Sequence, residues 1–157
     1  MIRLFPTFVL ALGLALSGWL LAGPALQGTE AFAAEPVHKV AVHVNENDPQ
    51  RMNMALNNVQ NMQSFYESAG QKVEIEVVAY GPGLHMLRAD TSPVKNRISA
   101  MSLEIEGLTF SACANTLQGM AKNEGKDITL LSESRTVPSG VVRLVELQEG
   151  GYAYVRP

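Results

Sequence analysis

Cys113 is the only cysteine in this chain of 157 residues, and it lies between two segments of different pattern. A short apolar run at 108–112 precedes it, and a stretch of helical composition follows it. At such a junction, unpaired backbone N–H groups and the positive end of the helix dipole favour a thiolate over a thiol. A thiolate at neutral pH is a nucleophile, a carrier of persulfide sulfur or a soft-metal ligand. The alternative is that Cys113 packs as a small, inert hydrophobic side chain, as many free cysteines do.

Two histidines follow predicted strands and could polarise this thiol. His43 lies at the end of a β-branched run at 39–44, and His85 lies in the glycine-rich segment after 72–79. The alternatives are that His43 is hydrogen-bonded within its strand and that His85 is a solvated loop residue. A thiol and two imidazoles could also bind a metal ion, but the sequence lacks the CxxC or HxH spacing typical of metal sites. We therefore expect no metal and no other cofactor.

Hydrophobic periodicity and turn residues indicate the elements that must position these side chains. Patterns typical of strands occur at 39–44, 72–79, 108–112, 128–131 and 152–155. Patterns typical of helices occur at 49–69, 84–88, 93–106, 114–122 and 138–149. Strands that alternate with helices pair in parallel through right-handed crossovers. The sequence predicts an α/β fold: a three-layer α/β/α domain around a central, mostly parallel sheet of about five strands.

Ligands of such folds bind beyond the carboxyl ends of the strands. The residues directly after the predicted strands should therefore share one edge of the sheet: they are 43–45, 80–83, 113–115 and 132–134. Gly81 opens a Gly-Pro-Gly segment that lacks the Lys-Ser/Thr of a phosphate loop and the GxGxxG of a dinucleotide site. We expect it to form a turn at the rim of the thiol site.

The N-terminal 33 residues have the three-part layout of a secretory signal. A basic start precedes an uncharged apolar run at 4–21, and the segment ends in Ala31-Phe32-Ala33. Cleavage after Ala33 would leave 34–157 as one domain in the periplasm, without a membrane attachment. The rival interpretation is an uncleaved anchor, because the run reaches the ~18 residues that a spanning helix needs. The helix-breaking Gly23-Pro24 pair argues against the anchor.

The charge pattern excludes one class of partner. The chain has 12 basic and 15 acidic residues, a formal charge of −3, and these charges are scattered. A nucleic-acid surface needs a concentrated positive footprint, so no nucleic-acid partner is expected. A single cysteine also allows no disulfide within the chain, so stability must come from a packed core.

Five segments, in this order, resemble the DsrE/DsrF-like family. They are HVN at 43–45, IEVVAYGPG at 75–83, FSACANTL at 110–117, VPSGVV at 137–142 and GYAYVRP at 151–157. The resemblance covers essentially the whole chain after residue 33. It implies an α/β/α domain that assembles into a trimer or another small homo-oligomer. It also implies a role in sulfur relay, in which Cys113 accepts sulfane sulfur as a persulfide and hands it on.

The leading hypothesis is therefore an exported sulfur-handling protein whose partners are a sulfur donor or acceptor protein. Helix N–H groups would stabilise the Cys113 persulfide, and Asn115 or His43 would orient it. The supporting residues we expect around the thiol are His43, Asn45, Gly81, His85 and Asn115. The alternative is a non-catalytic oligomeric module that binds a small molecule or a protein while Cys113 only packs. A copper- or haem-related accessory role ranks last.

Overall fold

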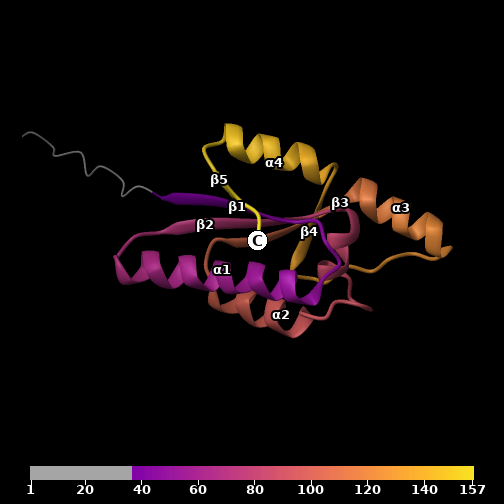
Figure 1. Cartoon of the computed structure of the whole chain (residues 1–157), viewed down its shortest axis with the longest axis horizontal. Helices are drawn as coiled ribbons and strands as arrows, with labels where there is room; N and C mark the ends of the chain where they lie inside the picture. Colours follow the sequence, from indigo (N-terminus) through magenta and orange to yellow (C-terminus); the bar gives the residue numbers. More distant parts are fainter. Residues whose placement is uncertain (1–36) are drawn as a thin grey trace, which may run out of the picture. The chain divides into compact units, whose positions relative to one another are not determined.

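Residues 37–157 are described by the computed structural model, and they form the three-layer α/β/α domain that the sequence predicts (Figure 1). Five parallel strands form one sheet in the order β4-β3-β2-β1-β5. The strands are β1 (His38–Val44), β2 (Val73–Ala79), β3 (Leu108–Cys113), β4 (Ser134–Val137) and β5 (Ala153–Val155). The helices are α1 (Pro49–Ser68), η1 (Gly81–Leu87, a 3₁₀ helix), α2 (Lys95–Glu104), α3 (Ala114–Glu124) and α4 (Gly140–Glu149).

The helices divide unequally between the two faces of the sheet. Helices α1 and α2 cover one face, α4 covers the other, and α3 projects from the end of β3 (Figure 1). The larger core lies under α1 and α2, where every second residue of β1, such as Val40 and Val42, packs against that layer. A smaller cluster lies under α4 and is formed by Ala41, Val78, Leu144 and Leu147. The central strands are mostly apolar, but the face under α4 also carries buried polar side chains: His43, Glu76 and Ser111.

The fourth predicted strand was placed wrongly. The sequence pattern indicated 128–131, whereas β4 is formed by Ser134–Val137. Leu130 makes an isolated antiparallel bridge to Arg88 instead. Leu130 and Leu131 pack against the larger core, which explains their apolar character without a place in the sheet. Consequently, the residues that follow β4 at the carboxyl edge begin at Pro138 and are not those at 132–134.

The predicted secretory signal, its cleavage site and the rival membrane anchor lie outside the described residues and stay predictions. Among residues 37–157 there is no helix with the length and apolar character needed to cross a membrane.

Candidate functional site

The strand register fixes which side chains share the face of the sheet that α4 covers. Side chains alternate along a strand, and Ser111 is opposite Val78, which in turn is opposite His43. Val78 packs under α4, so Ser111 and His43 lie on that face, and so does Cys113, two residues beyond Ser111. The thiol therefore lies at the carboxyl end of β3, under the layer formed by α4.

The first turns of two helices lie beside Cys113. The residue is the last of β3 and the N-cap of α3. The first residue of α4, Gly140, approaches from above, so closely that a Cβ atom added to it would lie 3.2 Å from the Cβ of Cys113. The same added atom would lie 2.8 Å from the Cβ of Tyr80. The thiol is thus enclosed between the first turns of α3 and α4, with Tyr80 beside it.

These helix ends change the acidity of Cys113, which is a free thiol that is only 5% exposed. Burial by itself raises the pKa of the thiol, because the charged form loses water. The hydroxyl of Thr116 and the backbone N–H groups of Gly140, Thr116 and Asn115 lower it by more, so the pKa lies below its ordinary value. The sulfur makes no capping hydrogen bond of ordinary geometry to α3, so these groups also act as nearby dipoles.

Thr116 is held so that its hydroxyl can donate to the sulfur. Its Oγ1 atom accepts a hydrogen bond of 2.9 Å from the backbone N–H of Gly81. With that lone pair occupied, the hydroxyl proton is free to point toward Cys113. Gly81 has φ of 53°, in the left-handed region that favours glycine, so the turn after β2 suits this residue. The expected turn at the rim therefore acts on the thiol indirectly: the backbone N–H of Gly81 donates to Thr116, and Thr116 lies beside the thiol.

His43 is on the correct face but is separated from Cys113 by Tyr80. Its ring stacks on Tyr80 with centroids 4.7 Å apart, and its Nδ1 atom lies 2.7 Å from the hydroxyl of Tyr154. Burial, and then the charge of Arg156, lowers the pKa of His43, which favours the neutral form of the ring. Its Nε2 atom is buried without a hydrogen-bond partner among the described residues. His43 is placed to support Tyr80, and no contact joins it to the sulfur.

The remaining expected site residues divide into two groups. Asn115 reaches the thiol through its backbone N–H, while its side chain is exposed. Asn45 lines a very small cavity beside His43. His85 pairs with the hydroxyl of Thr91 at 3.0 Å and makes no contact with the thiol. Within residues 37–157, no group of three His, Cys, Asp or Glu side chains could hold a metal ion.

Sequence reasoning missed Thr116 and Gly140 as site residues. Thr116 could have been found, because the side chain of a polar residue three positions after an N-cap often hydrogen-bonds back to the N-cap residue. Gly140 could not, because it reaches the thiol from a distant segment through the packing of α4.

A buried carboxylate anchors α4 over this site. Glu76 is 4% exposed and accepts hydrogen bonds from Ser111 at 2.6 Å and from Arg143 of α4 at 2.8 and 2.9 Å. Arg135 of β4 donates a further bond of 2.7 Å. Burial raises the pKa of Glu76, but the bonds from Arg143, Ser111 and Arg135 outweigh it and lower the pKa to about 2. The ionised Glu76 holds α4 against the sheet and so keeps Gly140 near Cys113.

Comparison with known proteins identifies a relative of solved structure. A solved structure, that of the protein of unknown function MTH1491 from Methanobacterium thermoautotrophicum, is 36% identical over 76% of this chain and 99% of the other, with a TM-score of 0.66. The chain belongs to the same family as MTH1491. No protein-family model matches the sequence, and neither does any curated protein. For this member of the MTH1491 family, the chemistry has to be argued from the site.

In the present member of the MTH1491 family, the site around Cys113 can stabilise negative charge on sulfur. It combines a thiol of lowered pKa with N–H and O–H donors from two helices, and it lies at the carboxyl edge of a parallel sheet. A groove of about 370 Å³ runs along β4 and the first turns of α4, past Val137, Ser139 and Val142. Val137 is the β4 partner of Cys113 in the register, so the groove passes one strand away from Cys113, which does not itself line it. A larger hollow of about 510 Å³ lies near Val73 and Gly107, at the opposite end of the strands from the thiol.

Proposed function

We propose that this protein carries sulfane sulfur as a persulfide on Cys113 and passes it to a partner. The observation that carries the proposal is the convergence of two helix N-termini and the Thr116 hydroxyl on one thiol of lowered pKa. In the reaction, the Cys113 thiolate attacks the outer sulfur of a donor persulfide, R–S–SH. The S–S bond of the donor breaks, the donor leaves as R–S⁻, and Cys113 carries S–SH. The N–H and O–H groups that favour the thiolate of Cys113 would also favour the ionised form of its persulfide.

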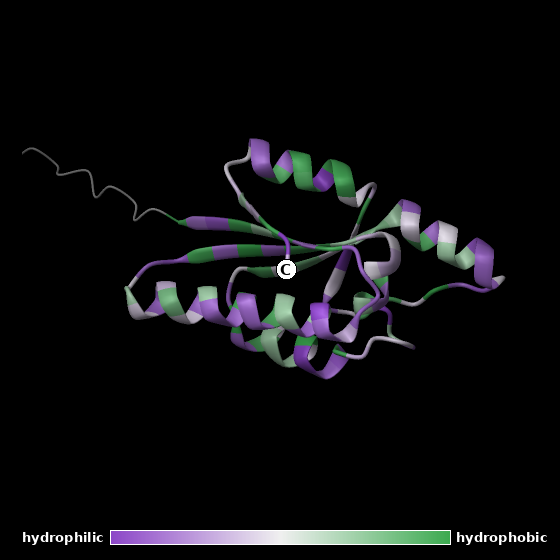
Figure 2. Ribbon diagram, viewed as in Figure 1, coloured by the Kyte–Doolittle hydropathy of each residue, from purple (hydrophilic) through white to green (hydrophobic). Residues whose placement is uncertain are grey.

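The resemblance to the DsrE/DsrF-like family supports the same chemistry and adds its setting. It indicates a trimer or another small homo-oligomer, and a sulfur donor or acceptor protein as partner. Three valines of α4, Val141, Val142 and Val145, are each about half exposed, which supports assembly through this helix. Much of the ribbon of α4 has the colour of hydrophobic residues (Figure 2). The predicted secretory signal places the exchange in the periplasm.

The proposal is tested by intact-mass analysis. The purified protein is incubated with a sulfane donor, and a gain of ~32 Da is expected on the wild type and not on Cys113→Ser. Because the chain has one cysteine, the adduct needs no mapping. An unrelated protein that is known to accept sulfane sulfur serves as the positive control. If the control gains the mass and the wild type does not, the sulfur-carrier proposal is wrong.

The burial of Cys113 favours a second candidate, a non-catalytic binding module in which the thiol only packs. A sulfur atom with so little exposure resembles a small core side chain. Under this function, Cys113→Ser would retain the oligomeric state and partner binding of the wild type. The sulfur-carrier function requires instead that this variant no longer transfers sulfur to or from the partner protein. A copper or haem role has no set of three clustered ligands to support it in the described part of the chain.

A further inference from the structure

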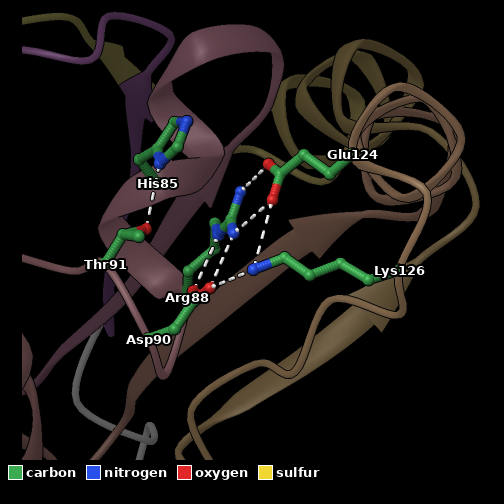
Figure 3. A network of polar contacts seen from close by, with 6 residues as sticks. All are labelled: His85, Arg88, Asp90, Thr91, Glu124 and Lys126. Carbon is green, nitrogen blue, oxygen red and sulfur yellow. Dashed lines mark hydrogen bonds and ion pairs between the residues drawn. The ribbon is translucent and has the colours of Figure 1, made fainter.

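His43 differs from the other two histidines of the chain in its surroundings. The Nε2 atom of His38 lies 3.1 Å from Oε1 of Gln71, and the Nδ1 atom of His85 lies 3.0 Å from the hydroxyl of Thr91 (Figure 3). Both of these rings are partly exposed. His43 is only 5% exposed, and its Nε2 atom has no hydrogen-bond partner within residues 37–157. A proton on this ring would place a charge and an unpaired N–H group in a buried position.

Residues 153–157 cover His43 on one side. They comprise β5 and the two residues after it, and β5 pairs with β1, the strand that carries His43. The hydroxyl of Tyr154 lies 2.7 Å from Nδ1 of His43. Arg156 and Pro157 line the very small cavity beside the ring. Departure of residues 153–157 would therefore bring water to His43.

Few other contacts hold these residues in place. Strand β5 is at the edge of the sheet, and within residues 37–157 it pairs only with β1. Tyr154 is 44% exposed, and Val155 is only partly buried against the core. Arg156 donates to Glu46 at 2.9 Å, but both side chains are nearly half exposed, so this ion pair contributes little stability. Elements with so little buried surface open most readily.

Tyr152 fixes the chain directly before β5. Its backbone N–H donates to the carbonyl of Leu147 at 2.9 Å, and its hydroxyl donates to Glu74 at 3.1 Å. Its ring packs against the apolar cluster under α4. Opening should therefore begin after Tyr152 and leave α4 in place.

The charges near His43 offer a proton on its ring no bonded partner. The charged side chains on the neighbouring elements are Glu46, Arg51, Glu76, Arg143, Glu146 and Arg156. Each of them takes part in an ion pair with another member of this set. Lys39, on the same face of β1, lies over the ring of Tyr152 at the other end of the strand. Within residues 37–157, the one side-chain hydrogen bond of His43 is to Tyr154.

Proton binding by His43 is unfavourable while residues 153–157 cover it. Burial, and then the charge of Arg156, lowers the pKa of the ring below its ordinary value of 6.5. In water the ring would regain its ordinary pKa, so the released state binds more protons than the covered one. The covered state is therefore most favoured above pH 6.5, and it loses this advantage as the pH falls from 6.5 toward the lower pKa of the covered ring.

We propose that residues 153–157 form a pH-sensitive strap over His43, which leaves the sheet when His43 binds a proton. In the covered state the neutral ring stacks on Tyr80 and is bonded to Tyr154. Release lets water solvate the charged ring and lets Arg156 move away from it. It also turns β1 into an edge strand, whose unpaired backbone groups are then available to another chain. The strap does not depend on the proposed sulfur transfer, and its test uses no sulfur donor.

Amide hydrogen exchange of the full chain at pH 7, 6 and 5 tests the strap, after correction for the intrinsic pH dependence of exchange. The lowest pH stays well above the pKa of Glu76, which is about 2. In the wild type, we expect the protection of the β5 amides to fall about three- to tenfold between pH 7 and pH 5. Protection in α4 and in the central strands should stay unchanged. NMR of the imidazole in the same series should give a pKa of His43 below 6.5.

Two variants remove the proton-binding group. His43→Gln keeps an amide that can bond to Tyr154, and His43→Phe keeps a ring that can stack on Tyr80. Neither side chain ionises, so the protection of β5 in both variants should be the same at pH 7 and pH 5. The matched control is His38→Gln, at the other end of β1, which should keep the pH response of the wild type.

Three results would refute the strap. The first is a wild type whose β5 amides keep their protection at pH 5, or whose His43 has a pKa of 6.5 or higher. The second is a loss of protection in both His43 variants that equals the loss in the wild type. The third is a loss in the wild type that spreads equally through α4 and the central strands, because that would be unfolding of the whole domain and not release of one strand.

Discussion

At the scale of single residues, the acidity of Cys113 depends on two opposing effects of its position. Burial removes water from the sulfur and disfavours the thiolate, while the dipoles of two helix ends and one hydroxyl favour it. The dipoles prevail because they come from fixed backbone N–H groups of Asn115, Thr116 and Gly140, which need no reorientation when the charge forms. The pKa of this thiol therefore lies below its ordinary value in a place that water hardly reaches.

Thr116→Val tests the largest favourable contribution. It preserves the shape of the side chain but removes the hydroxyl, so we expect the pKa of Cys113 to rise. The rate of alkylation at pH 7 should fall up to about tenfold, in line with one hydrogen bond to a charged group. Thr116→Ser keeps the hydroxyl and should keep the wild-type pH profile. A Val variant whose pH profile matches that of the wild type would show that the backbone N–H groups suffice.

The sequence predicted the position of Cys113 in the fold better than the contacts around it. A lone cysteine between an apolar run and a helical pattern indicates an N-cap, and Asn115 was expected near it because it follows two residues later. Gly81 was expected there because residues that follow parallel strands share one edge of the sheet. His85 was expected there as well, but the 3₁₀ turn of η1 directs it to Thr91. Local patterns locate a side chain on its element, whereas its contacts depend on how the elements pack.

At the scale of elements, the close approach of α4 to the sheet depends on the absence of a side chain at Gly140. An added methyl group would lie 2.8 and 2.9 Å from two atoms of Tyr80, which is shorter than van der Waals contact. We expect Gly140→Ala to lift the first turn of α4, to destabilise the protein by about 1–3 kcal/mol and to raise the pKa of the thiol. Denaturant unfolding and the pH dependence of alkylation measure the two effects.

Gly119→Ala is the control for this substitution. It also adds one methyl group to a helical glycine, but in open space, and should stabilise the protein by up to about 1 kcal/mol. Equal effects of the two variants would contradict the close packing of Gly140 against Tyr80 and Cys113.

The misplaced fourth strand shows where element prediction from a single sequence fails. Strand β4 has the sequence Ser-Arg-Thr-Val, and as the edge of the sheet it buries only Val137. An edge strand needs few apolar residues, so its pattern is weak, while the nearby run at 128–131 has a strong pattern because it packs against the core. The central strands were predicted well because most of their residues are buried and most of the buried ones are apolar.

At the scale of the whole molecule, the alternation of strands and helices was enough to predict the parallel sheet and its layers, because crossover connections leave few arrangements. It did not predict that a single helix would cover one face. That arrangement leaves α4 as the outer surface of its layer, with Val141, Val142 and Val145 facing outward. Surface apolar residues grouped on one helix favour an interface between subunits.

A charge in this group should therefore disrupt the proposed homo-oligomer. We expect Val145→Glu to lower the mass measured by sedimentation velocity from that of an oligomer to that of a monomer. The control is Leu103→Glu, on α2 at the other face, where the wild-type side chain is 89% exposed. This variant should keep the wild-type mass. A wild type that sediments as a monomer, or a Val145→Glu variant that still assembles, would contradict assembly through α4.

The response of the whole domain to acid should be governed by Glu76. Its pKa in the folded protein is about 2, below the ordinary 4.5, so ionised Glu76 adds stability at neutral pH that disappears as the pH falls from about 5 toward 2. The difference corresponds to about 3 kcal/mol. Denaturant unfolding at several pH values should show this decline for the wild type and for Glu149→Gln, which removes an exposed carboxylate of α4.

Glu76→Gln should be less stable at pH 7 by about 3 kcal/mol, because it leaves Arg143 without its charged partner. Its stability should also vary less over the same pH range. If the wild type and Glu76→Gln lost stability in parallel below pH 5, another carboxylate would have to hold α4 to the sheet.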